Sequence, residues 1–186
     1  MLKLFGAAAL ALATASASDA ATITVSGFSS GYQSNTVAIA PEATITSFGT
    51  DLYFGGAYSG EPGSFCAISG FGCEADLEIA FNGVVSSLMF DVGGYDVGDY
   101  LDINIFGIGD IFLGTIAVTS DVVGLDLSSF GSITRLFFDD TSTGAGFGYA
   151  NFSFDQVAAP VPLPAAGLLL IGALGGLAAL RRRKAA

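Results

Sequence analysis

The chain has 186 residues, a net charge of −11, no histidine, and hydrophobic residues at 52% of its positions. Residues 21–160 hold 16 of the 17 acidic residues and one of the six basic residues, Arg135, so this part has a net charge of −15. That charge excludes nucleic-acid binding, which needs clustered Lys and Arg to neutralise phosphates. The absence of histidine from the sequence excludes Ser-His-Asp and Cys-His catalysis.

Residues 1–20 have the three parts of a secretory signal peptide. Lys3 supplies the positive charge, residues 4–12 form a short apolar helix, and small residues follow at the cleavage region. These nine apolar residues are too few to span a hydrocarbon core of about 30 Å. We therefore expect export by the Sec machinery and cleavage after Ala20, with cleavage after Ala17 as the alternative.

Residues 21–158 are predicted to form the exported domain, built from short β-strands. Apolar and polar residues alternate in 76–81 and in 101–105, which is the period of a half-buried strand. Glycine-rich breaks such as residues 107–109 supply turns. Further strands are predicted at 22–25, 36–39, 44–46, 51–54, 85–92, 110–118, 132–138 and 147–156.

This spacing of strands predicts an all-β fold, in the form of an antiparallel, jelly-roll-like β-sandwich. Two packed sheets can each bury one face of such strands, which makes a sandwich the most economical arrangement. A solenoid is the alternative, although the sequence has no fixed internal period.

Cys66 and Cys73 are the only cysteines in the sequence, and they share one glycine-bearing stretch. Two cysteines in an exported domain predict a disulfide. Their spacing is not C-x-x-C, and no histidine is present to complete a zinc site, so a redox or zinc role is disfavoured.

An acidic stretch at residues 91–102 is the candidate metal site. It contains Asp91, Asp96, Asp99 and Asp102 between glycines, and calcium prefers clustered oxygen ligands on a flexible loop. Calcium is the only cofactor that the sequence suggests. The favoured interpretation of the stretch is nevertheless a hairpin whose turn uses Gly and Asp for their backbone tolerance.

Residues 159–186 combine a proline-containing motif, an apolar run at 165–180 and a basic tail at 181–184. The tail consists of Arg181, Arg182, Arg183 and Lys184. Sixteen helical residues reach about 24 Å, enough for a transmembrane helix if the bilayer thins locally. Because the basic tail resists translocation, we expect it to stay in the cytoplasm and the body to lie outside the inner membrane.

The motif before the apolar run is formed by Val161, Pro162, Leu163, Pro164 and Ala165. Together with the apolar helix and the basic tail, it resembles the VPLPA-CTERM form of the PEP-CTERM sorting signals. The resemblance implies a substrate of an exosortase, a membrane-embedded enzyme that cuts near the motif in Gram-negative bacteria that make exopolysaccharide. An uncleaved stop-transfer anchor is the alternative.

The body resembles the adhesin-like or lectin-like β-sandwich domains common in PEP-CTERM proteins. The similar features are residues 85–92, a Gly/Asp loop, residues 133–138 and residues 148–154, although Ala150-Asn151 departs from the usual Asp-Asn. The resemblance implies a non-enzymatic protein of the cell surface or extracellular matrix that serves an exopolysaccharide or biofilm by binding or as structure. The alternatives are a calcium-dependent carbohydrate-binding module and, less favoured, a carboxylate-based glycan hydrolase.

Overall fold

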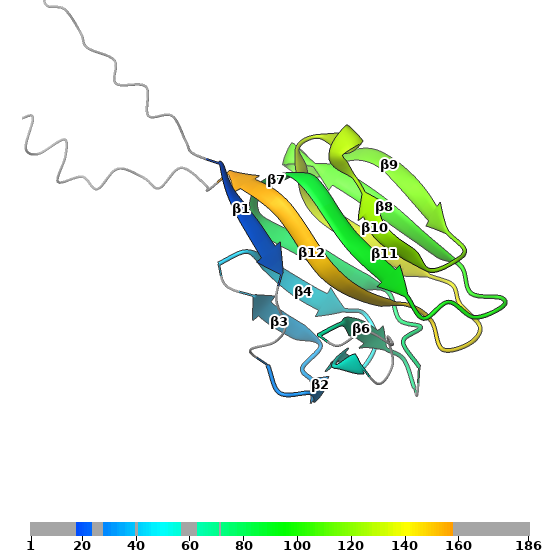
Figure 1. Ribbon diagram of the computed structural model, residues 1–186. Helices are drawn as coiled ribbons and strands as arrows, with labels where there is room; N and C mark the ends of the chain where they lie inside the picture. Colours follow the sequence, from blue (N-terminus) through cyan, green and yellow to red (C-terminus); the bar gives the residue numbers. More distant parts are fainter. Residues whose placement is uncertain (1–17, 24–27, 40, 57–62, 71, 158–186) are drawn as a thin grey trace, which may run out of the picture.

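The computed structural model describes residues 18–23, 28–39, 41–56, 63–70 and 72–157 (Figure 1). These residues form an all-β, antiparallel domain in which twelve strands share one hydrogen-bonded network. The prediction of an all-β antiparallel fold is confirmed. The C-terminal segment at 159–186, with the predicted helix at 165–180, lies outside the described residues. Within the described part of the chain, no helix is long and apolar enough to cross a membrane.

Most of the predicted strands are present with nearly the predicted bounds. The elements are β1 (Ser18–Ile23), β2 (Gly31–Gln33), β3 (Thr36–Ile39), β4 (Ala43–Ser47), β5 (Asp51–Phe54), β6 (Phe65–Ile68), β7 (Leu77–Gly93), β8 (Leu101–Gly107), the 3₁₀ turn η1 (Ile108–Asp110), β9 (Ile111–Val118), β10 (Val122–Asp126), the 3₁₀ turn η2 (Ser128–Phe130), β11 (Ile133–Asp140) and β12 (Gly148–Val157). The strands β2, β6 and β10 were not predicted, because they are short and lack a clear alternation of apolar and polar residues.

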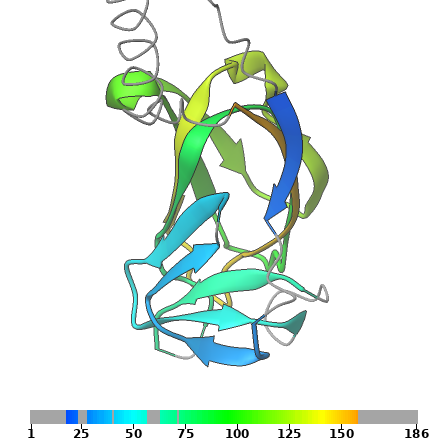
Figure 2. The ribbon, with the colours of Figure 1, turned by 90° about the vertical axis from the view of Figure 1, so that its left-hand side faces the viewer.

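The longest strand, β7, runs through both halves of the domain. One half is built on its pairing with β4 and β11, and the other on its pairing with β12 and β10. The first part of β7, residues 77–85, pairs with β4 and β11, whereas its second part, residues 84–93, pairs with β12 and β10. The prediction of two separate strands at 76–81 and 85–92 is therefore wrong. The chain stays extended through residues 82–84 and changes its partners there, which produces the sandwich-like arrangement seen in Figures 1 and 2.

Aromatic rings from four strands form the centre of the core. The ring of Phe152 in β12 stacks on Phe90 of β7, with centroids 4.6 Å apart, and on Phe65 of β6, with centroids 5.6 Å apart. Phe90 in turn contacts Phe138 of β11 edge-on at 5.8 Å. All four side chains are buried. The stack therefore joins strands from both halves of the domain through direct ring contacts.

Two residues with left-handed backbone interrupt the β7–β12 pair. Ser87 in β7 has φ of 52° and Asn151 in β12 has φ of 54°, and the register of the pair shifts twice along its length. These are β-bulges, which add a residue to a strand and re-aim the side chain at that point. At the second bulge the exposed Asn151 side chain reaches Asp91 of β7.

The first and last strands lie side by side at one end of the domain (Figure 1). β1 and β12 are antiparallel, with Ser18 opposite Val157, so the chain enters and leaves the domain at the same place. Three residues of β1, Ser18 to Ala20, fall within the predicted signal peptide. Cleavage after Ala20 would remove these three paired residues, whereas cleavage after Ala17 would leave the whole strand.

Candidate functional site

A trough with a volume of about 340 Å³ lies where β7 ends and where β10 and β12 begin. This volume is at the lower end of the range for small-molecule sites. The trough is lined by Ser64, Asp91, Val92, Gly93, Gly94, Asp121, Val122, Val123, Gly148 and Ala150. Its wall is formed by small residues and two carboxylates, and none of these lining residues offers an aromatic ring on which a sugar could stack.

Asp91 connects the three strands around the trough. Its Oδ1 accepts a hydrogen bond of 2.6 Å from the backbone N–H of Gly124 in β10, and its Oδ2 accepts one of 2.6 Å from Nδ2 of Asn151 in β12. The second carboxylate, Asp121, precedes β10 and accepts a hydrogen bond of 2.9 Å from the backbone N–H of Tyr95. Both carboxylates therefore hold the walls of the trough in place, and their remaining lone pairs can accept from hydroxyl donors of a ligand.

The four predicted calcium ligands do not converge. Asp91 lines the trough, whereas Asp99 is buried and its Oδ2 accepts a hydrogen bond of 2.9 Å from the backbone N–H of Asp96. Asp102 lies in β8, where its charge raises the pKa of the exposed Tyr100 hydroxyl. In the ranges that the structure describes, no group of three or more His, Cys, Asp or Glu side chains is placed to hold a metal ion. The predicted calcium site is therefore not formed by these residues.

The hairpin interpretation of residues 91–102 is also wrong. β7 and β8 do not pair with each other, because each of them pairs with β11, which lies between them. Residues 94–100 form the connection, and at its end the carbonyl of Tyr100 accepts a hydrogen bond of 3.0 Å from the backbone N–H of Thr141, just after β11. The connection contains a turn in which the backbone N–H of Asp99 donates to the carbonyl of Asp96 at 3.1 Å, so Gly and Asp serve a turn here but in a longer connection.

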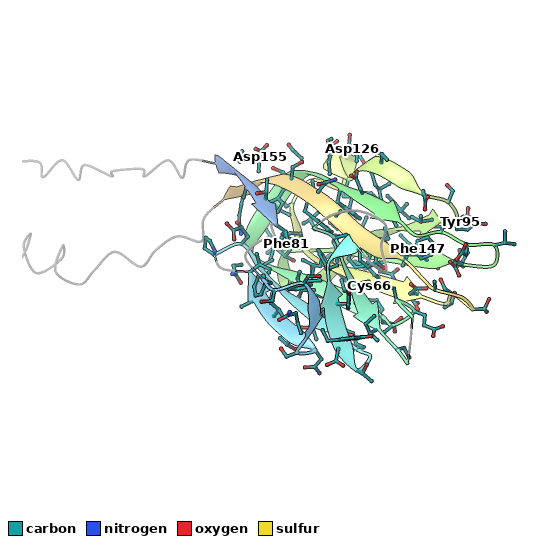
Figure 3. All side chains as sticks on the ribbon, turned by 60° about the horizontal axis from the view of Figure 1, so that its bottom comes forward. Cys66, Phe81, Tyr95, Asp126, Phe147 and Asp155 are labelled. Atoms are coloured by element: carbon teal, nitrogen blue, oxygen red, sulfur yellow. A yellow bond between two sulfur atoms is a disulfide. The ribbon has the colours of Figure 1, made fainter. Side chains whose placement is uncertain are left out.

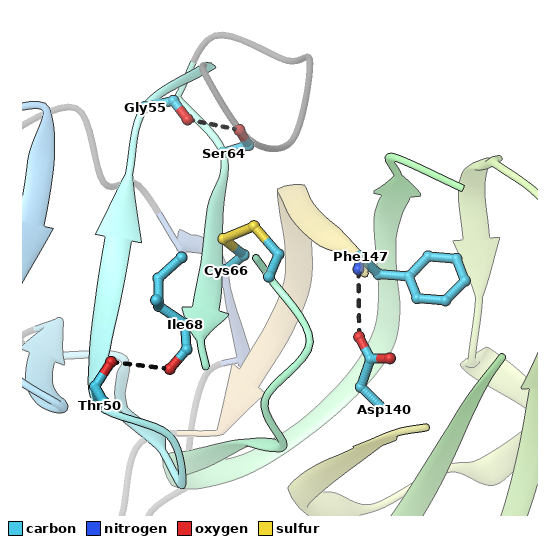
Figure 4. The surroundings of a disulfide bond; sticks show 8 residues. Thr50, Gly55, Ser64, Cys66, Ile68, Asp140 and Phe147 are labelled. Atoms are coloured by element: carbon cyan, nitrogen blue, oxygen red, sulfur yellow. Dashed lines mark hydrogen bonds between the residues drawn. A yellow bond between two sulfur atoms is a disulfide. The ribbon is translucent and has the colours of Figure 1, made fainter. Parts of the chain in front are cut away.

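A second acidic group, which the sequence does not assign to a site, lies at the end of β11. The carboxylate of Asp140 accepts hydrogen bonds from the backbone N–H groups of Ser142 at 2.9 Å and Phe147 at 3.2 Å (Figure 4). The backbone N–H of Asp140 donates to Oδ1 of Asp76 at 3.1 Å. Phe147 also packs beside Tyr95, with ring centroids 6.3 Å apart (Figure 3). Asp140 thereby shapes the loop that leads into β12 and the trough.

Burial raises the pKa values of several groups in this region. Burial is the main cause of the raised pKa of Asp140, and the charge of Asp99 adds to it against the lowering hydrogen bonds of Ser142 and Phe147. Burial likewise raises the pKa of Asp76. The pKa of the fully buried Tyr149 hydroxyl is raised by burial and then by the charges of Asp140 and Asp76. The carboxyls of Asp76 and Asp140 therefore resist ionisation more strongly in the folded chain than in the unfolded chain.

We predict that the contribution of Asp76 and Asp140 to stability increases as the pH falls from 7 through their raised folded-state pKa values. The folded-state pKa values of Asp76 and Asp140 lie above the ordinary value of 3.8, so between these values the folded chain binds more protons than the unfolded chain. The substitution Asp76→Asn keeps an acceptor for the Asp140 N–H and removes the charge. At pH 7 this substitution should raise the free energy of unfolding by up to about 1 kcal/mol, a magnitude limited by solvent screening. The gain should disappear near pH 4.

The matched control for Asp76→Asn is Asp126→Asn, measured in the same thermal unfolding series. Hydrogen bonds from Ser128 lower the pKa of Asp126, so its ionised form favours the folded state and the control should destabilise at pH 7. Equal effects of the two substitutions at pH 7 would contradict the assignment.

The predicted disulfide between Cys66 and Cys73 is confirmed (Figure 4). Both cysteines are buried and pack with Ile68 and the half-buried Tyr53 in a cluster beside the main core. The backbone N–H of Cys73 donates to the carbonyl of Ala145 at 2.6 Å. The bridge therefore connects β6 to the loop that follows Asp140.

The remaining predicted site residues are not placed by the structure, with one exception. Ala20, the predicted cleavage position, lies in β1 opposite Asp155. The motif Val161–Ala165 and the basic tail at 181–184 lie outside the described residues. Comparison of the chain with protein-family models, with curated proteins and with solved structures finds no match.

Proposed function

We propose that this protein is exported, sorted by an exosortase, and then serves as a non-enzymatic component of the cell surface or of an exopolysaccharide matrix, with a jelly-roll-like sandwich as its body. The proposal rests on one observation, the order of motif, apolar run and basic tail in residues 161–184. A short apolar segment followed by cationic residues leaves the upstream domain on the outer side of the membrane.

Two features of the described domain support this proposal. The ends of β1 and β12 are paired, so a membrane-inserted signal peptide and a C-terminal membrane helix would both join the domain at one place. The Cys66–Cys73 disulfide suits the oxidising environment outside the cytoplasm. The domain is therefore built in a way that tolerates attachment to a membrane at both ends.

The arrangement of the carboxyls favours a non-enzymatic role. A glycan hydrolase needs a carboxyl that keeps its proton, with a raised pKa, beside a substrate cleft and opposite a second carboxyl. The aspartates whose pKa is raised, Asp76 and Asp140, do not line the trough. The calcium-dependent carbohydrate-binding alternative loses its main support, because its four aspartates are dispersed.

The proposal predicts that the sorting motif is required for C-terminal processing. The substitution Pro162→Ala with Pro164→Ala removes the rigid, extended backbone that proline imposes before the helix. The full chain with this change should accumulate with its C-terminal segment intact in cells that contain the exosortase, whereas the unchanged chain should lose it. Intact-mass analysis of the protein recovered from these cells measures the difference, and Pro160→Ala, just outside the motif, is the control.

The same mass spectra locate the N-terminus. Because Ser18 to Ala20 pair with β12, we favour cleavage after Ala17, which keeps these pairs, and expect a mature chain that starts with Ser18. A chain that starts with Ala21 would support the original prediction of cleavage after Ala20. A C-terminus that stays intact in the unchanged chain despite active exosortase would favour the stop-transfer anchor and end the sorting proposal.

A further inference from the structure

The strand β9 forms an open edge of the domain. β9 pairs antiparallel with β8, and the strand order ends with it; Figure 1 shows it at the margin, far from β3. In the described part of the chain, no strand other than β8 pairs with β9. The register irregularity between Ile105 and Phe106 of β8 places a bulge at Leu113, so residues 114–118 form the regular part of this edge. Its outward N–H and C=O groups can pair with another strand.

The edge strand β9 and the turn before it carry exposed apolar side chains. The side chains of Ile108, Ile111 and Phe112 are 61%, 64% and 56% exposed. Residues 103–120 contain a single charged residue, Asp110. Its carboxylate lies 2.7 Å from Nη2 of Arg135, and Arg135 is the one basic residue of the body. Arg135 also lies 3.1 Å from Oε2 of Glu78, so two carboxylates share this cation, and Asp102 of β8 lies opposite Ala117. The strand β9 itself carries no charged residue.

Charge decides which surface of this protein a second copy can approach. Two bodies of net charge −15 repel each other over most orientations. Contact through β9 places an uncharged strand against an uncharged strand, with Asp102 one strand away from the seam, so the repulsion is smallest there. An antiparallel strand edge is also self-complementary, because a two-fold axis through the strand pairs it with its own copy.

The other open edges are less suited to such pairing. β2 has three residues and β3 has four. β1 contains Asp19, and β10 ends at Asp126. Natural edge strands are protected by short length, charge, proline or bulges. β9 has eight residues without charge or proline, and its single bulge leaves the stretch 114–118 regular.

We propose that two copies of this chain pair antiparallel through residues 114–118 of β9 and form a two-fold symmetric dimer. The sheet that ends at β9 in one copy continues into β9 of the other. The contact is isologous, so it closes at two copies and does not propagate into a fibre. The proposal does not depend on sorting by an exosortase, because it rests on the body alone.

The test uses Thr115→Lys with Ala117→Lys, which places four lysines along the seam of the dimer. Both side chains are exposed, and Asp102 lies opposite Ala117 in β8, so a lysine there gains an acidic neighbour within its own chain. The matched control is Val97→Lys with Val123→Lys, two exposed positions with the same change of charge.

Sedimentation velocity of the protein purified from cells that express the full chain measures the association over a concentration series. We expect a dimer for the unchanged chain and for the control. We expect a twofold lower mass for Thr115→Lys with Ala117→Lys, which loses the hydrogen bond from Thr115 to Asn104 but should still unfold cooperatively. A monomeric unchanged chain overturns the proposal. A dimer that persists in the β9 variant also overturns the proposal, and association through the C-terminal segment would give this result. Dissociation of the control variant overturns it as well.

Discussion

Replacement of Phe152 by alanine is expected to lower the free energy of unfolding by about 3–5 kcal/mol. Phe152 is 1% exposed and its ring contacts both Phe90 and Phe65. The substitution removes these stacking contacts and leaves a cavity that the neighbouring rings cannot fill without leaving their own partners. Because Phe90 also contacts Phe138 of β11, the loss affects the contact between the two halves of the domain. Urea denaturation measures the change, provided that the slope of unfolding free energy against urea concentration is the same for both proteins.

The control for Phe152→Ala is Phe48→Ala. Phe48 is 59% exposed and touches Phe137, with ring centroids 5.6 Å apart, so its replacement should cost below about 1 kcal/mol. The intermediate substitution Phe152→Leu keeps most of the apolar volume and should lie between the two. If Phe152→Ala costs no more than the Phe48 control, the ring stack does not hold the two halves together.

The strands with a clear alternation of apolar and polar residues were predicted well from the sequence. β8 shows buried and half-buried residues in strict alternation along all seven positions, and β3 and β5 have the predicted bounds. Such strands are half buried in one sheet, and their period of two reports directly on which face is inward. In β6 all four residues are buried, so no period marks that strand in the sequence.

Long-range pairing explains why β7 was divided in the prediction. Asn82-Gly83 is a common turn dipeptide, and it lies between the two predicted strands. In the structure the backbone N–H of Asn82 donates to the carbonyl of Glu42 at 2.9 Å and its Nδ2 donates to the carbonyl of Pro41 at 2.7 Å. These partners are distant in sequence, and they hold the chain extended where its local preference is to turn.

The candidate site was only partly predictable for the same reason. Asp91 was identified as a candidate from its acidic surroundings, but its partners Gly124 and Asn151 come from β10 and β12. The bulge at Asn151 requires a left-handed backbone that asparagine tolerates better than most residues. No local pattern shows which asparagine forms a bulge, so neither the trough nor the dispersal of the four aspartates follows from the sequence.

Loss of the disulfide is expected to have the second largest effect. Closing a loop of this size, with a sequence separation of 7, stabilises the folded state by about 2–3 kcal/mol on the chain-entropy model. The double substitution Cys66→Ala with Cys73→Ala should lower the free energy of unfolding by at least that amount, because both side chains are 1% exposed and part of a packed cluster. Chemical denaturation with and without reductant measures the loss.

The reductant distinguishes the contribution of the disulfide bond to stability from the contribution of cysteine side-chain packing. Reduction of the unchanged chain removes the bond and keeps both sulfur atoms, so it should cost less than the double alanine substitution. Because the bridge is buried, the reductant must act during unfolding rather than on the folded protein. The double variant should be insensitive to reductant, and a reductant-dependent shift in that variant would mean that the measured change does not come from this bond. Since Cys73 also donates to Ala145 in the loop after Asp140, proteolysis in residues 141–147 should increase when the bond is absent.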